Sequence, residues 1–570
     1  MSRKSPFGKM SMRIAGEKSS SLDQARGRIV LIVGAFILVY MMVAARLVDA
    51  TIIQGYFAHN GEQENHETIT QTKQKRRADI VDRNGVILAS SLKTASLYAD
   101  QKRITDAVAS AKALTEIFPD MTYGETLKKL QGNKRFVWIK RNLTPSEQRK
   151  ILEIGDPGLA FEYDYRRMYP QGKLTSHMVG YTDVDGRGTA GVEHSFDKLL
   201  NESKEPLKLT LDIRLQHILK REIQRAMEEF TAMGGAGLIM DVNTGEVLAS
   251  VSLPDFDPHE TSIKVNDDRR FNRATLGVYE LGSTFKVFTA AAILEKKHIK
   301  MSTTFDATKP LKRGRFTISD YHPEKRALTL PEVFMVSSNI GTALMGEEVG
   351  TEAMKNLYSD LGFMKKAEFE IDELGKPIIP NPWREINTLT ASYGHGIAVS
   401  PLQLTSGFSA IVNGGYLVKP SLVMKEGKRS THTDIRVISQ ETSLKMRQLL
   451  RLVVSEGTAK KADVKGYMVG GKTGTADKNF NGRYAKDRRI SSLVSAFPIN
   501  DPKYAVFIMV DEPHGTKASY GYATAGWVAA PAVARVISSI GPILNMKADK
   551  DAPDLSEPLK SYLHQAVAEH

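Results

Sequence analysis

Three short motifs supply the residue types that acyl transfer through a serine requires. The first is Ser283 with Lys286, at the start of a long apolar segment. The other two follow it, in order along the chain: Ser337-Ser338-Asn339 and Lys472-Thr473-Gly474-Thr475. Serine and lysine three residues apart also occur at Ser90/Lys93 and Ser195/Lys198, so the pair alone is a weak signal. Only the pair at Ser283 opens a long apolar segment, directly after Gly282, and its combination with the two later motifs is a strong signal.

The spacing of the first pair predicts how it acts. Residues i and i+3 of a helix share a face, so the Lys286 amine is expected beside the Ser283 hydroxyl. A free lysine has a pKa of about 10.4 and is almost entirely protonated at neutral pH. Desolvation by the apolar helix and a second cation at Lys472 would both lower that pKa. We therefore predict Ser283 as the acylated nucleophile and Lys286 as the neutral general base.

The two later motifs are suited to moving protons and binding substrate. Ser337 is predicted to relay a proton to the leaving amine, and Asn339 to hydrogen-bond a substrate amide. The run GGKTGTA predicts a strand with an open edge, to which a peptide adds as a further strand. Backbone N–H groups of Ser283 and Thr475 are the candidates for holding an oxyanion. The residues predicted to bind the substrate and its terminal carboxylate are Lys472, Thr473, Gly474 and Thr475.

An apolar run near the N-terminus predicts a single membrane anchor. Residues 29–45 contain no charge, and a helix of about 20 residues spans a bilayer. Residues 1–28 carry an excess of Lys and Arg, which places the N-terminus in the cytoplasm by the positive-inside rule. A cleaved signal peptide is the alternative, but the run is long for one and lacks a clear cleavage site. We predict a transmembrane helix at residues 29–48, with the rest of the chain beyond the membrane.

Composition narrows the class of protein. The chain of 570 residues is too long for one compact core. It contains no cysteine, which excludes disulfides, thiolate catalysis and Cys-ligated metal sites. The net charge of +13 is spread without a basic stripe, so we expect no nucleic-acid partner. His322 and His395 have no metal-spaced partners, so we expect cleft-wall or structural roles for them, with no metal and no cofactor.

Changes of pattern along the chain predict its domains. A hairpin with its turn at residues 82–85 and helical patterns at 103–118 and 144–154 precede a helix that begins after Asp212. Closely spaced strands follow from residue 235 and again from 467, and short connections require them to pair antiparallel. The predicted parts are a cytoplasmic tail at 1–28, the helix at 29–48, a pedestal domain at 49–232, a catalytic domain at 233–545 and a flexible tail at 546–570.

Over most of residues 25–545 the chain resembles class B penicillin-binding proteins. Besides the catalytic motifs, the matching segments are RRADIVDRNGVILA, RRMYP, HMVGYTDVDGRGTAGVEHSFD, LTLDIRLQ, NRATLGVYELGSTFK, SPLQL and SEGTAKKADVKGYMVGGKTGTA. The resemblance implies an α+β fold, with an elongated pedestal domain of the dimerisation type before a transpeptidase domain whose five-stranded antiparallel sheet is flanked by helices. It also implies a serine D,D-transpeptidase that cross-links peptidoglycan stem peptides and is acylated by β-lactam antibiotics, without glycosyltransferase activity.

Within this class the chain resembles the division-specific, septal branch of the FtsI type. The segments TISDYHP, SSNIGTA and Gly394-His395-Gly396 are similar to that branch. The resemblance implies a bacterial inner-membrane protein at the division septum, with a periplasmic catalytic domain. The implied partners are an FtsW-type glycosyltransferase and other divisome proteins. Leu281 stands where the family commonly has proline, and Ala78 where it commonly has glycine.

Four other functions remain as alternatives. An elongation-specific class B transpeptidase would have the same catalytic motifs. A serine β-lactamase also has them, but it must hydrolyse its acyl-enzyme and needs neither anchor nor pedestal. A bifunctional synthase would carry a glycosyltransferase domain ahead of the transpeptidase domain, and residues 50–232 show none. A divisome scaffold or β-lactam receptor would keep the motifs without using their chemistry.

Overall fold

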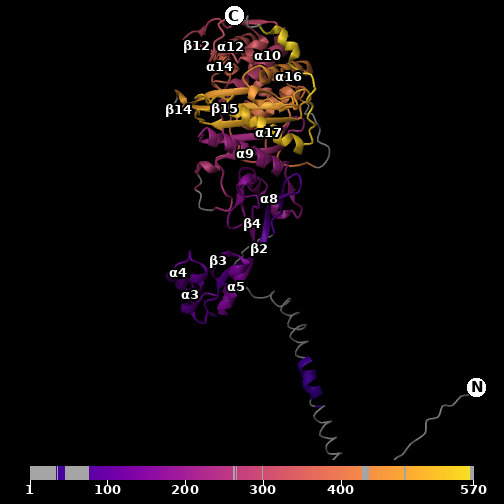
Figure 1. Ribbon diagram of the computed structural model, residues 1–570. Helices are drawn as coiled ribbons and strands as arrows, with labels where there is room; N and C mark the ends of the chain where they lie inside the picture. The colour runs from indigo at the N-terminus through magenta and orange to yellow at the C-terminus, as the bar shows by residue number, and fades with distance from the viewer. Residues whose placement is uncertain are drawn as a thin grey trace, which may run out of the picture. The chain divides into compact units, whose positions relative to one another are not determined.

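The computed structural model describes residues 34, 36–44, 76–260, 264, 266–297, 299–425, 435–480 and 483–564 (Figure 1). The chain divides into two units, residues 1–73 and residues 74–570. Half of the predicted anchor at 29–48, and residues 49–75 after it, lie outside the described residues; residues 36–44 are helical. Within the part of the chain that the structure describes, no helix is both long and apolar enough to cross a membrane.

A mixed sheet forms the centre of the N-terminal half of the second unit. Its long strand β2 (Ile87–Ala99) pairs antiparallel with β1 (Ile80–Val81), β3 (Val137–Leu143) and β4 (Leu159–Met168), and β1 pairs parallel with β7 (Leu207–Lys208). The turn between β1 and β2 is closed by Asp82, whose carboxylate accepts hydrogen bonds from the N–H groups of Asn84 and Val86. The hairpin predicted at residues 82–85 is therefore confirmed.

Three helices cover one end of this sheet and enclose a separate small core. They are α3 (Ala107–Ile117), α4 (Tyr123–Leu130) and α5 (Pro145–Ile154). Asp106 caps α3, and Thr144 forms a capping box with Glu147 at the start of α5, which explains why the helical patterns begin there. The other short elements before residue 212 are η2 (Gly172–Thr175), α6 (Ser176–Val179), β5 (Tyr181–Thr182), β6 (Gly188–Ala190), α7 (Gly191–Ser195) and α8 (Asp197–Glu202).

A second sheet organises the C-terminal half of this unit. Its order is β14-β15-β16-β8-β9, and every pairing is antiparallel. The strands are β8 (Gly234–Asp241), β9 (Val247–Leu253), β14 (Gly470–Phe480), β15 (Arg483–Phe497) and β16 (Tyr504–Asp511). The predicted five-stranded antiparallel sheet is confirmed, and β14 lies at its edge.

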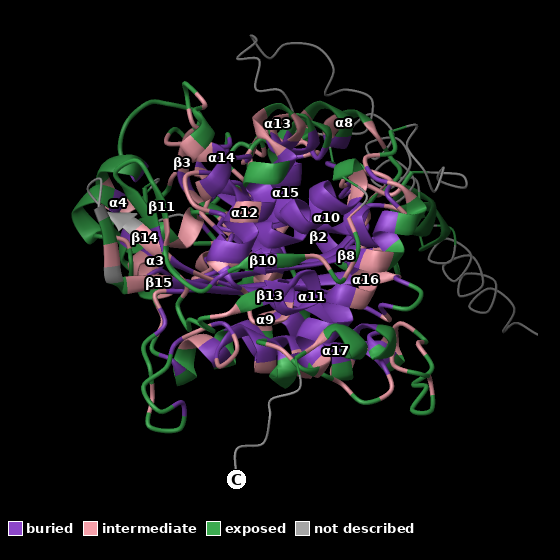
Figure 2. Cartoon of the chain, turned by 90° about the horizontal axis from the view of Figure 1, so that it is seen from above, coloured by how far each residue is buried: buried purple, intermediate pink, exposed green. Residues whose placement is uncertain are grey.

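Helices cover both faces of the second sheet (Figure 1). On one face lie α9 (Ile213–Glu229), capped by Asp212 as predicted, and α17 (Ala529–Ile543). On the other lie α10 (Lys286–Lys297), α15 (Pro401–Val412) and α16 (Gln440–Ser455). Every residue of α15 is buried, and Figure 2 shows α10 and α15 as largely buried ribbons at the centre of the molecule. The helix α15 is thus packed on every side, and its buried polar side chains, such as Gln403, hydrogen-bond to carbonyl groups.

The remaining elements form the region around the start of α10. They are η3 (Asp268–Arg270), η4 (Gly282–Phe285), β10 (Thr304–Asp306), β11 (Leu311–Arg313), β12 (Phe316–Ile318), β13 (Ala327–Thr329), α11 (Leu330–Met335), α12 (Asn339–Val349), α13 (Thr351–Asp360), α14 (Glu385–Ser392) and η5 (Lys460–Ala462). Two short hairpins, β10 with β13 and β11 with β12, lead from α10 towards α11 and α12. This region carries two of the three predicted motifs.

The C-terminal segment differs from the expected flexible tail over residues 546–564. It contains a short helix, η6 (Glu557–Tyr562), whose Leu559 is buried in the main core. The Asp554 carboxylate accepts a hydrogen bond of 2.8 Å from the Arg451 side chain on α16. The polar composition hid this docking, because it depends on three scattered leucines, Leu555, Leu559 and Leu563, and on charges that are paired within the fold. Residues 565–570 lie outside the described residues.

Candidate active site

Close backbone contacts hold the short helix η4 against strand β14. A Cβ atom on Gly474 would lie 2.3 Å from the carbonyl oxygen of Leu281, and a Cβ atom on Gly394 would lie 2.0 Å from that of Gly282. Only glycine permits such approaches. Ser283, the second residue of η4, is thereby fixed between β14 and the loop that contains His395. Leu281 is accommodated here with φ −90° in place of the family's proline.

The turn before α12 places Ser337 between two lysine side chains. Lys286 Nζ donates to Ser337 Oγ at 3.1 Å, to the Ser337 carbonyl oxygen at 2.5 Å and to Asn339 Oδ1 at 2.7 Å. Lys472 Nζ, from β14, donates to Ser337 Oγ at 2.9 Å. Ser337 itself has φ +62°, a left-handed conformation that is uncommon outside glycine. Such strain is typical of residues held in place for function.

Both lysines have the shifted pKa values that the proposed chemistry requires. Their side chains are buried, with exposed fractions of 1% for Lys286 and 0% for Lys472. Burial lowers the pKa of Lys286 well below its usual value, and the positive charge of Lys472 lowers it further, against an opposing effect of Asp320. Burial alone lowers the pKa of Lys472 to about 7. These are the two causes expected from the sequence for Lys286.

Asp320 anchors the turn that carries Ser337, although its role was not predicted. Its carboxylate accepts hydrogen bonds from Ser338 Oγ at 2.7 Å and from the backbone N–H groups of Asn339 and Ile340 at 2.5 and 3.0 Å. Ser338 in turn caps α12 by accepting from the Gly341 N–H. A negative charge at the N-terminus of α12 also interacts favourably with the helix dipole. The only signal in the sequence was its place in the segment TISDYHP.

A cavity of about 500 Å³ brings the predicted residues together. Five of the eight predicted site residues line it: Ser283, Ser337, Asn339, Thr473 and Thr475. Lys286 and Lys472 reach it through their contacts with Ser337, and Gly474 contributes the close approach of backbone described above. Among the described residues, no hydrogen bond joins Lys286 to Ser283, so the expected direct contact between them is replaced by the contacts with Ser337 and Asn339.

The edge strand and its neighbours define the rest of the cavity. The hydroxyl groups of Thr473 and Thr458 are 2.7 Å apart, and Thr475 Oγ1 accepts a hydrogen bond of 3.1 Å from the Ala525 N–H. The Thr475 hydroxyl keeps its proton for another acceptor, as carboxylate binding requires. Asn339 is more occupied than predicted: Oδ1 accepts from Lys286, and Nδ2 donates to the Ser319 carbonyl at 3.0 Å. Both contacts would position the lysine.

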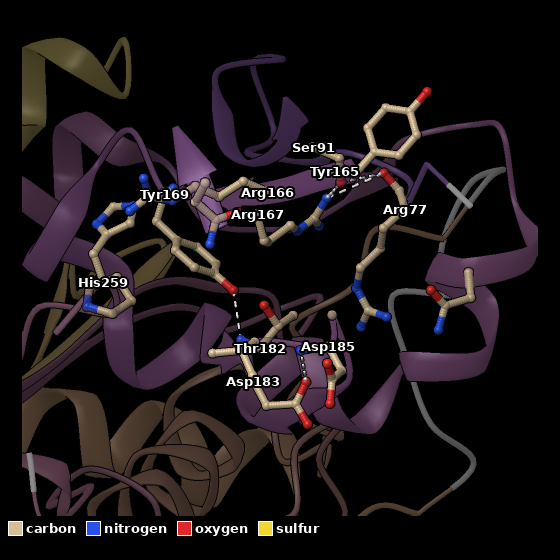
Figure 3. A pocket seen from close by; sticks show the side chains of 15 residues that line it. Arg77, Ser91, Tyr165, Arg166, Arg167, Tyr169, Thr182, Asp183, Asp185 and His259 are labelled. Atoms are coloured by element: carbon tan, nitrogen blue, oxygen red, sulfur yellow. Dashed lines mark hydrogen bonds between the residues drawn. The ribbon is translucent and has the colours of Figure 1, made fainter. Parts of the chain in front are cut away.

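A second, smaller cavity of about 160 Å³ lies between residues of the pedestal and His259, away from the predicted residues (Figure 3). Its wall contains Arg77 and Arg167, both of which donate at 2.6 Å to the carboxylate of Glu193, on α7. Figure 3 shows Arg167 also bonded to Ser91 Oγ, at 3.1 Å. Because Glu193 has no exposed surface and both guanidinium groups are buried, this ion network joins β2, β4 and α7 from within. We assign it a structural role.

A serine beside two buried lysines, at the edge of an antiparallel sheet with a pedestal before it, defines a class of serine acyl-transfer proteins. Comparison with known families agrees. The penicillin binding protein transpeptidase domain matches residues 235–537, and the penicillin-binding protein dimerisation domain matches residues 72–212. The chain belongs to the penicillin-binding protein transpeptidase family. The predicted class B family, with its dimerisation and transpeptidase domains, is confirmed.

Individual relatives are consistent with this assignment. The chain is 40% identical over 484 residues to the probable peptidoglycan D,D-transpeptidase FtsI of Caulobacter vibrioides, covering 83% of this chain and 82% of that protein. It is 28% identical over 513 residues to the peptidoglycan D,D-transpeptidase FtsI of Escherichia coli, with 83% and 84% covered. The crystal structure of penicillin binding protein 3 from Mycobacterium tuberculosis, complexed with aztreonam, shares the fold with a TM-score of 0.67 at 24% identity, covering 85% of this chain and 98% of that one.

Proposed function

We propose that this protein is a septal peptidoglycan D,D-transpeptidase that cross-links stem peptides through an acyl-enzyme on Ser283. The observation that carries the proposal is the convergence of Lys286 and Lys472 on Ser337 Oγ in the cavity lined by Ser283. The names of the relatives, peptidoglycan D,D-transpeptidase FtsI, support the substrate and the septal role.

Acylation begins with a donor peptide lying along the open edge of β14. The D-Ala carboxylate is held by Lys472 and by the hydroxyl groups of Thr473 and Thr475, and the backbone N–H groups of Ser283 and Thr475 face the carbonyl oxygen. Neutral Lys286 accepts the Ser283 proton as Oγ attacks the carbonyl carbon of the D-Ala–D-Ala bond. The proton then passes by way of Ser337 to the leaving amine, and D-Ala departs.

The second half of the reaction releases Ser283 from the acyl group. An amine of a neighbouring stem peptide attacks the ester carbon and the bond to Ser283 Oγ breaks. Lys286 accepts the proton that the amine loses and passes it to that oxygen. Burial favours this cycle, because it lowers the pKa of Lys286 and so makes the neutral form of the base easier to reach.

The proposal includes the setting of the reaction. We place the protein in the bacterial inner membrane through residues 29–48, with the transpeptidase domain at 233–545 on the periplasmic side, at the division septum. An FtsW-type glycosyltransferase and other divisome proteins are the proposed partners, since glycan strands must be made where they are cross-linked. The pedestal at 49–232 would then carry the transpeptidase domain away from the membrane.

Labelling with a fluorescent penicillin tests the chemistry. We expect the full chain to form a covalent adduct that survives denaturation, and Ser283→Ala to form none. Ser90→Ala, which alters a serine of one of the other Ser/Lys pairs, is the matched control and should label like the wild type. Equal labelling of wild type and Ser283→Ala would refute the proposal. Rapid loss of the label, with turnover of the β-lactam, would favour the serine β-lactamase instead.

A further inference from the structure

A group of aromatic and acidic side chains adjoins the nucleophile, apart from the two lysines. Glu280 lies three residues before Ser283, and its carboxylate accepts a hydrogen bond of 3.0 Å from Tyr484 Oη, on β15. The Tyr484 ring stacks on His395, with 5.4 Å between the ring centroids. His395 and Tyr393 line the same cavity as Ser283. Glu280 and Tyr484 do not line the cavity themselves; they adjoin it through the His395 ring that stacks on Tyr484.

Among the described side chains, none with a positive charge forms an ion pair with the half-buried carboxylate of Glu280. Within the described part of the chain its contacts are with neutral donors, the Tyr484 hydroxyl and the Gly396 N–H, and burial raises its pKa. By contrast, Asp511 accepts from Lys478 at 2.9 Å, and Asp477 accepts from Arg489 at 3.0 Å. A partly desolvated carboxylate without a counter-charge attracts a cationic ligand group.

The neighbouring rings do not oppose such a cation. Burial lowers the pKa of His395, so the imidazole is neutral at pH 7, and burial raises the pKa of Tyr393 to about 12, so that its hydroxyl stays protonated. The faces of neutral aromatic rings attract ammonium groups. The carboxylate and the rings thus favour the same kind of ligand.

We propose that Glu280, Tyr484 and His395 form the subsite that binds the primary ammonium group of the acceptor stem peptide. The cavity then divides by charge: the end with Lys286 and Lys472 receives the donor carboxylate, and the end with Glu280 receives the acceptor cation. In the transfer, the amine nitrogen bonds to the acyl carbon as the bond to Ser283 Oγ breaks. Of the two protons that the ammonium loses, one goes through Lys286 to Ser283 Oγ and the other to solvent. This inference rests on the proposed function.

The test compares attack by an acceptor amine with acylation in the full chain and in Glu280→Gln, which keeps the shape and removes the charge. The acyl-enzyme is formed from a thioester donor that lacks an amino group, and its transfer to a diamino-acid acceptor and to water is measured. A charge-assisted hydrogen bond contributes about 1.5–3 kcal/mol, so we expect the ratio of aminolysis to hydrolysis to fall about tenfold or more. Raised ionic strength should increase the acceptor KM of the wild type more than that of Glu280→Gln.

Two further measurements make the result decisive. Glu347→Gln, at an exposed pair with Arg313, is the control and should keep the wild-type ratio. Hydroxylamine, which is uncharged at pH 7, should react with both acyl-enzymes at similar rates. An unchanged ratio in Glu280→Gln, or a parallel fall in acylation by the thioester donor, would overturn the inference. Neither outcome bears on the proposed function, which is tested separately by the formation and the persistence of the penicillin label on Ser283.

Discussion

Lys286 and Lys472 donate to the same atom, Ser337 Oγ, at 3.1 and 2.9 Å. Two ammonium groups that share one acceptor in a buried site repel each other, so the protonation of one lysine depends on that of the other. Burial lowers the pKa of both, and Lys286 is lowered further by the charge of Lys472. Because the charge of Lys472 lowers the pKa of Lys286, we infer that Lys286 is the lysine that gives up its proton and acts as the base.

Replacing Lys472 should shift the pH dependence of acylation. In Lys472→Met the repulsion is lost, so the pKa of Lys286 rises towards its usual value. Since the base is active above its pKa, the acidic limb of the acylation rate should move to higher pH. The rate at pH 7 should also fall by about 10²-fold or more, the usual size of an acid–base contribution. The measurement is the rate of labelling by a fluorescent penicillin from pH 5 to 10. A limb that stays in place would show that the two lysines are not coupled.

Replacing Asp320 should shift the same limb in the opposite direction. The Asp320 charge raises the pKa of Lys286, so Asp320→Asn should lower that pKa and extend acylation to lower pH. The variant also loses the charged acceptor for Ser338 Oγ and two backbone N–H groups. We therefore expect its free energy of unfolding to be about 1–3 kcal/mol lower than that of the wild type. Urea unfolding and the labelling profile measure the two effects separately. A shift in the same direction as in Lys472→Met would contradict the assignment.

Because Ser337 has a left-handed backbone, two substitutions at this position should affect acylation equally and stability differently. Ser337→Ala and Ser337→Gly both remove the hydroxyl that contacts the two lysines, so both should lose most acylation. At φ +62° glycine avoids the strain that alanine keeps, and Ser337→Gly should be about 1 kcal/mol more stable than Ser337→Ala. Thermal and urea unfolding of the two variants give the difference. Equal stabilities would mean that the turn relaxes when the hydroxyl is removed.

The sequence predicted the site well where each motif is local. Ser283 and Lys286 share one helical segment, and GGKTGTA contains the glycines that an edge strand beside another backbone requires. The antiparallel pairing of the consecutive strands followed from their short connections. The direct bond expected between Ser283 and Lys286 is absent among the described residues. The spacing of Ser283 and Lys286 along a helix could not predict the actual partners of the Lys286 amine. These are Ser337 and Asn339, which come from a different turn and accept hydrogen bonds from that amine.

Other features depend on distant residues and leave little trace in the sequence. Asp320 is recognisable as an anchor only when its three donors from residues 338–340 are in place. Glu280 and Tyr484 are far apart in the chain and meet because β15 pairs with β14, beside η4. The docking of residues 546–564 depends in part on the hydrogen bond that Arg451, on α16, donates to the Asp554 carboxylate. In each case a pairwise contact across the fold decides the role of a residue whose type alone is unremarkable.

The ion network of the pedestal gives a last prediction. Glu193 bridges Arg77 and Arg167, so Glu193→Gln leaves two buried guanidinium groups without their shared carboxylate. Removing one partner of a buried ion pair typically costs about 3–5 kcal/mol, and we expect a loss of this size in urea unfolding. Glu347→Gln, at an exposed pair, should cost less than about 1 kcal/mol. Because the network lies outside the active-site cavity, the folded fraction of Glu193→Gln should still label with penicillin. Loss of labelling without loss of stability would give Glu193 a role in catalysis instead.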